Sequence, residues 1–350
     1  MPRAGRPLYL PRQNTMRPLL SLLPLLLLAC GGPDATRSTA APPPSYPLPL
    51  VFDTDANNEL DDQHALAYLF LNDSTFDVKA ITTNATSNGG NIEEHTAEAR
   101  RIMTLFNVAD RYPLIDGANQ DYATIRPYLR DDFGFDGQEA VDFIISEALK
   151  DHGQPLVIVP VGKLTNVALA LEKAPEITDR VRVVWLGSNY PEPGEYNQDN
   201  DEAALNYLLD ADVPFEIVTV RYGKPTGSDA VRIDSVEVER LLAGKGPVGS
   251  AAVTGRHGGS FERFGDYAVD LFANIEQYHG DPPSRAMFDM VALAVLKNPA
   301  WGERRDIPAP RLASGRWVER PDNPRTITLW ENFDGERILA DFFAGLDAAQ

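Results

Sequence analysis

A dense group of carboxylates follows the first strongly apolar run of the globular part of the chain. Five acidic side chains fall within ten residues: Asp53, Asp55, Glu59, Asp61 and Asp62. Carboxylates gathered in one place repel each other unless a cation binds between them. Carboxylate and carbonyl oxygens with no thiolate favour a hard ion such as Ca²⁺ or Mg²⁺. The alternative is a solvated acidic turn in which Asp61 or Asp62 caps a helix, but a cap accounts for only one of the five.

The segments on either side of this group predict its place in the fold. Leu50–Asp55 is apolar enough to be a buried strand, and a helical pattern begins near His64. Asp53 and Asp55 share one face of that strand, because side chains alternate along it. The group is therefore expected at the carboxyl end of the first strand, where open parallel sheets bind their ligands.

Short apolar runs and helical patterns alternate along the rest of the chain. We expect strands at Leu50–Asp55, Val78–Thr83, Leu156–Val161, Val181–Gly187 and Phe215–Val220. We expect helices at Asp62–Leu71, Ile92–Phe106, Gln138–Leu149, Leu164–Leu171, Asp201–Leu209, Phe261–Gln277, Ser284–Leu296 and Glu336–Leu346, and a small hairpin of Arg316–Glu319 with Thr326–Trp330. Apolar strands separated by helices predict an α/β fold of one domain, with a doubly wound, mostly parallel central sheet flanked by helices.

Composition excludes several classes of protein. With 43% hydrophobic and 24% charged residues the chain is globular rather than disordered or fibrous. Its single cysteine excludes an intramolecular disulfide and a thiolate metal cluster. A formal charge of −19 repels phosphate backbones, so we expect no nucleic-acid partner.

The N-terminal region has the pattern of a targeting segment. Met16 and Arg17 precede the apolar run Leu19–Leu28, which is shorter than the ~20 residues of a bilayer span and matches the core of a signal peptide. The run leads to Cys30 and resembles a bacterial lipoprotein signal, whose cysteine is lipidated; ordinary secretion with an incidental cysteine is the alternative. We therefore expect a lipid anchor at Cys30 that holds the protein at the periplasmic or extracytoplasmic face of a bacterial cell envelope. The expected organisation is an N-terminal extension and signal peptide over 1–30, a tether rich in Pro, Ala and Ser over 31–47, and a globular domain over 48–350.

Further short motifs follow the acidic group in a fixed order. They are Asp53-Thr54-Asp55 with Asp61-Asp62, Ile81-Thr82-Thr83 with Asn84, Asn88 and Asn91, Val161 to Asn166, Leu186 to Asn189 with Glu195-Tyr196-Asn197 and Asp201-Glu202, and Phe288-Asp289. Together they resemble the nucleoside hydrolase family, the calcium-dependent N-ribohydrolases of the inosine-uridine preferring type. The resemblance extends from about Leu50 to the C-terminus, so it covers nearly all of the expected globular domain.

The resemblance implies an activity and a set of site residues. The reaction would be hydrolysis of the N-glycosidic bond of ribonucleosides to free base and ribose, through an oxocarbenium-like transition state. Ca²⁺ would be held by Asp55, Asp62, Asp289 and the backbone carbonyl of Val161, and Asp55 would deprotonate a calcium-bound water as general base. The substrate would contact Asp61, Asn88, Asn189, Glu195, Asn197 and Phe288. The expected partners are a small-molecule nucleoside and further copies of the chain, as a homodimer or homotetramer.

Two features depart from the usual motif of the family. The stretch from Asp55 to Asp61 is two residues longer, and Glu59 in it points either to solvent or into the site. Phe288 stands where many members carry a histidine proposed to protonate the leaving base. The alternatives are that Phe288 stacks on the base, or that the acid is one of three other residues: His257, Arg256 or Tyr222.

Two other functions remain open at this point. Asp53-Thr54-Asp55 after an apolar strand also fits a haloacid-dehalogenase type phosphatase, in which the first aspartate attacks phosphate with the help of Mg²⁺. That function leaves the paired Asp61-Asp62 and Glu195-Tyr196-Asn197 without a role. The second is a surface lipoprotein that binds nucleosides or sugars and has no turnover, which the longer loop and the missing histidine both allow.

Overall fold

The computed structural model describes residues 47–350 apart from 132 and 276–277, so Cys30 and the expected signal peptide lie outside the described residues. An eight-stranded sheet runs in the order β11-β14-β6-β5-β4-β1-β2-β3. Its strands are β1 (Leu48–Thr54), β2 (Phe76–Thr83), β3 (Leu114–Ile115), β4 (Leu156–Pro160), β5 (Val181–Leu186), β6 (Phe215–Val218), β11 (Glu303–Pro308) and β14 (Thr326–Glu331). All neighbours are parallel except β11, which is antiparallel to β14. The expected doubly wound, mostly parallel fold is confirmed.

Three small two-stranded sheets and a set of helices surround this sheet. The pairs are β7 (Arg232–Asp234) with β10 (Ser284–Ala286), β8 (Val248–Thr254) with β9 (Ser260–Arg263), and β12 (Arg311–Ala313) with β13 (Arg316–Val318). The α-helices are α1 (Asp61–Phe70), α2 (Ile92–Leu105), α3 (Tyr122–Ile125), α4 (Gln138–Ala148), α5 (Thr165–Lys173), α6 (Tyr196–Asn200), α7 (Glu202–Asp210), α8 (Val238–Leu242), α9 (Phe264–Ala273), α10 (Met290–Lys297) and α11 (Gly335–Ala348). Short 3₁₀ turns lie at Arg126–Tyr128, Pro175–Ile177, Ser228–Ala230 and Pro299–Trp301. No described helix is long and apolar enough to cross a bilayer.

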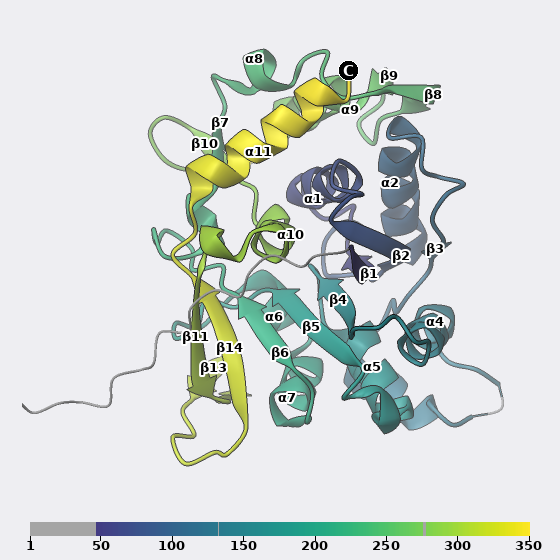
Figure 1. The fold of residues 1–350 in the computed structure, drawn as a ribbon, viewed down its shortest axis with the longest axis vertical. Helices are drawn as coiled ribbons and strands as arrows, with labels where there is room; N and C mark the ends of the chain where they lie inside the picture. The colour runs from purple at the N-terminus through teal and green to yellow at the C-terminus, as the bar shows by residue number, and fades with distance from the viewer. Residues whose placement is uncertain (1–46, 132, 276–277) are drawn as a thin grey trace, which may run out of the picture. The chain divides into compact units, whose positions relative to one another are not determined.

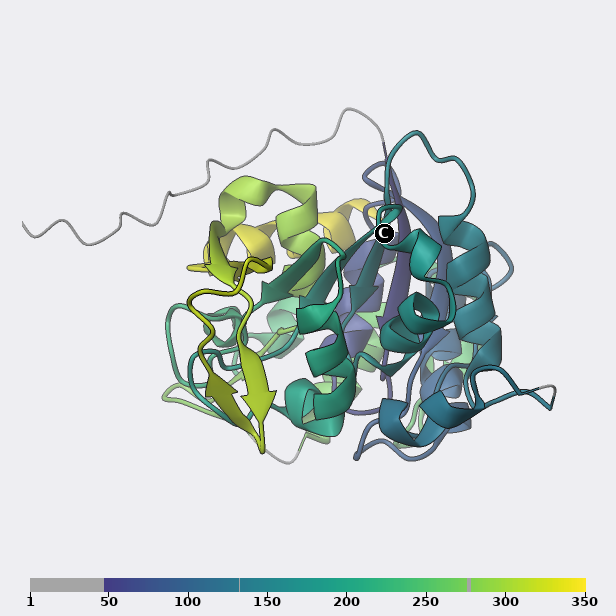
Figure 2. The same ribbon diagram turned by 90° about the horizontal axis from the view of Figure 1, so that it is seen from below.

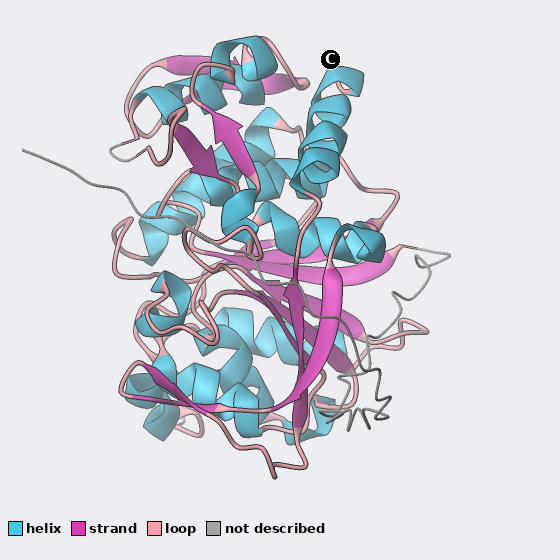
Figure 3. Cartoon of the chain, turned by 90° about the vertical axis from the view of Figure 1, so that its left-hand side faces the viewer, coloured by secondary structure: helices cyan, strands magenta, loops and turns pink. Residues whose placement is uncertain are grey.

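Both faces of the sheet are buried, because alternate strand residues enter two separate cores. Leu50 and Phe52 pack with α1, α2, α9, α10 and α11, whereas Val51 packs on the other face with α4, α5 and α7. Figures 1 and 3 show these two layers of helices on opposite sides of the strands. Figure 2 looks from the side of α4, α5 and α7, whose teal ribbons lie in front of the sheet.

The strand order reverses beside β1, which lies between β4 and β2. The chain first extends the sheet from β1 through β2 to β3, and then returns to add β4, β5 and β6 on the other side. The connections therefore diverge at the carboxyl ends of β1 and β4, which leaves a crevice there for ligands.

The C-terminal hairpin is paired differently from the expectation. Arg316–Val318 pairs with Arg311–Ala313, while Thr326–Glu331 enters the large sheet between β11 and β6. Burial explains the difference, because Ile327, Leu329 and Trp330 are apolar and need a core. The tight turn that closes β12–β13 is instead Ser314-Gly315, whose φ angles of 53° and 71° suit a two-residue hairpin loop.

Two expected helices also begin later than their apolar patterns indicate. The strand β9 occupies the start of Phe261–Gln277, and β10 occupies the start of Ser284–Leu296. In β10 the residues pair with β7, so their backbone groups are satisfied across a ladder rather than within a helix. Asp289 is consequently the residue just before α10 and not part of its interior.

Candidate active site

A cavity of about 320 Å³ lies at the carboxyl edge of the sheet. Asp55 follows β1, Val161 follows β4, and Leu186 ends β5, so consecutive strands of the sheet contribute to its wall. Six carboxylates line it: Asp55, Glu59, Asp61, Asp62, Glu195 and Asp289. Below, the carboxylate cluster denotes Asp55, Asp61, Asp62 and Asp289, and the arginine end denotes Glu59, Tyr222, Arg285 and Phe288.

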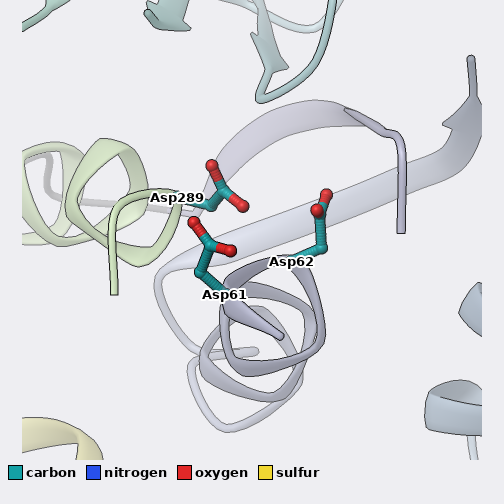
Figure 4. Close-up of side chains that lie close together, drawn as sticks. All are labelled: Asp61, Asp62 and Asp289. Atoms are coloured by element: carbon teal, nitrogen blue, oxygen red, sulfur yellow. The ribbon is translucent and has the colours of Figure 1, made fainter. Parts of the chain in front are cut away.

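Three members of the carboxylate cluster converge on one point. Asp61 and Asp62 open α1, Asp289 precedes α10, and one ligand atom from each lies within 4.8 Å of the others (Figure 4). Burial, followed by the charges of neighbouring carboxylates, raises the pKa of Asp61 to about 7. The same causes raise the pKa values of Asp62 and Asp289 well above the usual range. These oxygens therefore fit a divalent cation, whose charge would offset their mutual repulsion.

The capping alternative for the acidic group is wrong. The residue that caps α1 is Leu60, and no side chain accepts a hydrogen bond from the first turn of the helix. Asp61 and Asp62 are also buried rather than solvated. The Thr54 hydroxyl donates to Asp62 at 2.5 Å, which fixes this carboxylate beside the end of β1.

Asp55 is almost completely buried and faces the cavity. The Thr86 hydroxyl donates to its Oδ2 at 2.5 Å, so one oxygen is held from the side of β2. Burial above all, and then the charges of Asp53 and Glu195, raise the pKa of Asp55 to about 7. Its place depends on Gly162, since a Cβ atom there would lie only 2.7 Å from Asp55 Oδ1.

Asp53 has a different environment, although it lies on the same strand face. Its carboxylate accepts hydrogen bonds from the Thr82 hydroxyl and from the side-chain amides of Asn84 and Asn166, at 2.6, 3.0 and 2.8 Å. The side chain is completely buried and does not line the cavity. Asp53 is therefore a structural hydrogen-bond acceptor that links β1 to β2 and α5. The phosphatase mechanism requires this carboxylate to attack phosphate, so its burial away from the cavity argues against that mechanism.

Glu195 and Asn197 line the cavity beside the cluster. The Glu195 carboxylate accepts hydrogen bonds from the backbone N–H groups of Ser188, Asn197 and Gln198, which fix its orientation. The Asn197 amide donates to the carbonyls of Val161 and Leu186, at 2.7 and 3.2 Å. A carbonyl oxygen has two lone pairs, so Val161 keeps one for a further ligand.

Asn88 and Asn189 lie outside the cavity lining. Asn88 is exposed and its backbone N–H donates to the Tyr196 hydroxyl at 2.8 Å. The Asn189 side chain accepts from the Tyr222 N–H at 3.0 Å and donates to the Gly194 carbonyl at 2.5 Å. Asn189 therefore positions Tyr222, which does line the cavity.

The model of the family described as inosine-uridine preferring nucleoside hydrolase matches this chain over residues 50–339. The chain belongs to that family. Among its curated relatives, the pyrimidine-specific ribonucleoside hydrolase RihA of Escherichia coli O7:K1 is 29% identical over 195 residues, which are 48% of this chain and 58% of the relative. RihA of Shewanella oneidensis is 28% identical over 222 residues, which are 57% of this chain and 66% of the relative. The matches thus span somewhat less than two thirds of the length of these relatives.

Solved nucleoside hydrolase structures share the fold. A plant nucleoside hydrolase, PpNRh1, superposes with a TM-score of 0.66 at 17% identity and covers 86% of this chain and 99% of its own. A purine-preferring ribonucleoside hydrolase from Gardnerella vaginalis gives a TM-score of 0.62 at 20% identity, over 86% and 98%. At such identities the likeness establishes the architecture and nothing finer.

Within this nucleoside hydrolase fold, the arginine end contains a residue that the sequence analysis missed. Arg285 lines the cavity, forms an ion pair with Glu59, and has its Nη2 3.8 Å from Asp61 Oδ1. Glu59 belongs to the longer loop. Because it lines the cavity and pairs with Arg285, it points into the site as well as toward solvent. The sequence contains one sign of this residue: a single arginine stands directly before the apolar segment that includes Asp289.

The three other candidates for the acid that protonates the leaving base lie in two different hollows. Tyr222 lines the cavity, with its ring edge-on to Phe288 at a centroid distance of 5.7 Å. Arg256 and His257 line a neighbouring hollow together with Asn88, and Arg256 donates to the Asn57 carbonyl at 3.1 Å. The longer loop lies between these two hollows, because Asn58 and Glu59 line both.

Proposed function

We propose that this chain hydrolyses the N-glycosidic bond of ribonucleosides, releasing free base and ribose. The observation that carries the proposal is the carboxylate cluster, which lines one cavity at the crevice of a nucleoside hydrolase fold. The curated relatives that match by sequence are named pyrimidine-specific ribonucleoside hydrolases. Those names support a riboside substrate.

We propose Ca²⁺ as the cation, held by Asp55, Asp62, Asp289 and the Val161 carbonyl. The support is chemical, since all of these donors are oxygens and most are charged. When bound, the ion would supply Lewis acidity toward the ribose hydroxyls and the attacking water. Asp61 belongs to the same converging group as Asp62 and Asp289; in this proposal it accepts a hydrogen bond from a ribose hydroxyl instead of binding the ion.

Asp55 is proposed to act as the general base. The water oxygen forms a bond to C1′ of ribose, a water proton passes to Asp55, and the electron pair of the C1′–N bond leaves with the base. Glu195 and Asn197 offer further acceptors for sugar hydroxyls, and their own hydrogen bonds hold them in place. The surrounding carboxylates stabilise the positive charge that develops on the sugar.

A panel of nucleosides tests this function. We expect equal amounts of ribose and base from at least one nucleoside, no release after treatment with a chelator, and recovery when Ca²⁺ is added. Chelator-sensitive binding without ribose from any nucleoside would support the binding lipoprotein instead. Asp53, the residue that would attack phosphate in a phosphatase of the haloacid-dehalogenase type, is held by Thr82, Asn84 and Asn166, so we expect no release from p-nitrophenyl phosphate.

We also propose that a lipid at Cys30 holds the protein at the cell envelope. The support is the short apolar run that ends at the only cysteine of the chain. The full-length protein, produced in a bacterium, is expected in the membrane fraction and to incorporate a labelled fatty acid. The variant Cys30→Ser should lose the label; a labelled variant would contradict the anchor.

A further inference from the structure

The charges that line the cavity are strongly unbalanced. Against six carboxylates, Arg285 is the one lysine or arginine among the described lining residues. Its side chain is only 9% exposed, and it is paired with Glu59 from the longer loop. The Nε–H of Arg285 is buried and has no hydrogen-bond partner among the described residues.

Aromatic side chains accompany this arginine. The guanidinium carbon lies 5.6 Å from the centroid of the Phe288 ring, and Tyr222 meets the same ring edge-on. Such a surface of aromatic rings beside a fixed cation suits a flat heterocycle that carries partial negative charge. The carboxylate cluster, in contrast, suits the hydroxylated sugar and its cation.

Building on the nucleoside hydrolase function proposed above, we propose that Arg285 contacts the leaving base and stabilises the negative charge that the base acquires. As the C1′–N bond breaks, its electron pair moves into the base, and the guanidinium is the fixed positive charge on that side of the described cavity lining. The base leaves as an anion and takes its proton from water after release. Phe288 supports the guanidinium and the base ring, in place of an acid at that position.

The guanidinium acts as a charge rather than as a proton donor. Burial lowers the pKa of Arg285 to about 10, which leaves the group protonated at neutral pH. It offers only N–H donors, so it recognises bases whose charge spreads onto carbonyl oxygens. The substrate class is therefore nucleosides whose base carries a carbonyl oxygen, such as uridine, cytidine and inosine, in preference to adenosine.

The proposal is tested by comparing two leaving groups in the Arg285→Gln variant. We expect kcat/KM for uridine to fall about 10²-fold or more, the range seen when one preorganised donor to a developing anion is removed. p-Nitrophenyl β-D-ribofuranoside releases a stable phenolate without help, so its kcat/KM should change less than about 3-fold. The control Arg240→Gln removes an exposed arginine that pairs with Glu237 on α8 and should alter neither. Equal losses with both substrates would overturn the proposal.

A second variant keeps the test valid if Arg285→Gln does not fold. The pair Glu59→Gln with Arg285→Met removes both charges and leaves no unpaired carboxylate from the ion pair. It should show the same difference between uridine and the nitrophenyl riboside, and the absence of that difference would also overturn the proposal.

Failure of the hydrolase function has a different signature. If the wild-type protein with Ca²⁺ releases ribose from neither substrate, the proposed function fails, and the base contact is then tested by calorimetric titration with uridine. At least a 10-fold loss of affinity in Arg285→Gln would support the contact. Equal affinity in the two proteins, or no measurable binding to the wild type, would overturn it.

Discussion

The two ends of the cavity are built from the sequence in different ways. In the carboxylate cluster, Asp55, Asp61 and Asp62 come from one short segment at the end of β1 and the start of α1. The arginine end draws Glu59 from that segment but takes Tyr222 from the loop after β6 and Arg285 from β10. Three of the four carboxylates at the first end are therefore local in the chain and Asp289 alone comes from a distant segment, whereas the second end exists only in the folded protein.

The two ends also differ in charge: the first holds four carboxylates, whereas at the second the guanidinium of Arg285 is paired with Glu59, and this difference matches the chemistry proposed for them. Cleavage of a glycosidic bond places positive charge on the sugar and negative charge on the departing base. Carboxylates around the sugar and a guanidinium beside the base each oppose the charge that develops nearby. The ends should therefore respond differently to mutation, and the following predictions use that difference.

The largest effect is expected for Asp55→Asn, at the carboxylate end. The amide cannot take a proton from water, so turnover should fall by about 10³-fold, within the usual range for loss of a general base. The fold should survive, because asparagine has the same shape and removes a charge that burial and its neighbours already oppose. Release of ribose and thermal unfolding monitored by circular dichroism check both parts. Near-normal turnover would show that the base is another residue.

A smaller but still large effect is expected for Gly162→Ala. The added Cβ would lie 2.6 Å from Asn84 Oδ1 and 2.7 Å from Asp55 Oδ1, so the Asp55 carboxylate must shift. Since small displacements of catalytic groups lower rates steeply, we expect a loss of about 10²-fold for every nucleoside tested. Gly335→Ala is the matched control, because its nearest neighbour would be 3.4 Å away. Unchanged turnover in Gly162→Ala would mean that the position of Asp55 is not critical.

The carboxylate end was largely predictable from the sequence, and the physical reason is its locality. Asp55, Asp61 and Asp62 follow a strand whose burial is evident from its apolar run, and the edge of a parallel sheet then fixes their common location. Asp289 was predicted through resemblance to the family, although its helix begins at Met290, six residues after the expected start at Ser284 and directly after Asp289 itself.

The arginine end was not predictable in the same way. The ion pair between Glu59 and Arg285 joins segments far apart in the chain, and neither local pattern indicates the other. The expected helix over Ser284–Leu296 also placed Arg285 on a helix, whereas pairing of β10 with β7 turns it toward the cavity wall. Similarly, nothing local distinguished Asn88, which is exposed, from the buried Asn84 of the same loop.

At the arginine end, Phe288→Leu should have a moderate effect. Leucine keeps an apolar contact but removes the ring beneath the guanidinium, and such cation–π contacts are worth about 0.5 to 2 kcal/mol. We expect kcat/KM for uridine to fall about 3- to 30-fold, with little change for p-nitrophenyl riboside. A large and equal loss for both substrates would place Phe288 at the sugar end instead.

The smallest effect, less than about 2-fold, is expected for His257→Ala. Arg256 Nε donates to His257 Nε2 at 3.3 Å, and His257 Nδ1 faces Asp270 at 3.6 Å. The ring lines the neighbouring hollow and not the cavity of the carboxylate cluster, where the base is expected to bind. Measuring kcat for uridine and for the nitrophenyl riboside distinguishes the possibilities. If the variant lost activity with uridine alone, His257 would be the acid for the leaving base, and Arg285 would lose its assigned role as the group that stabilises an anionic base.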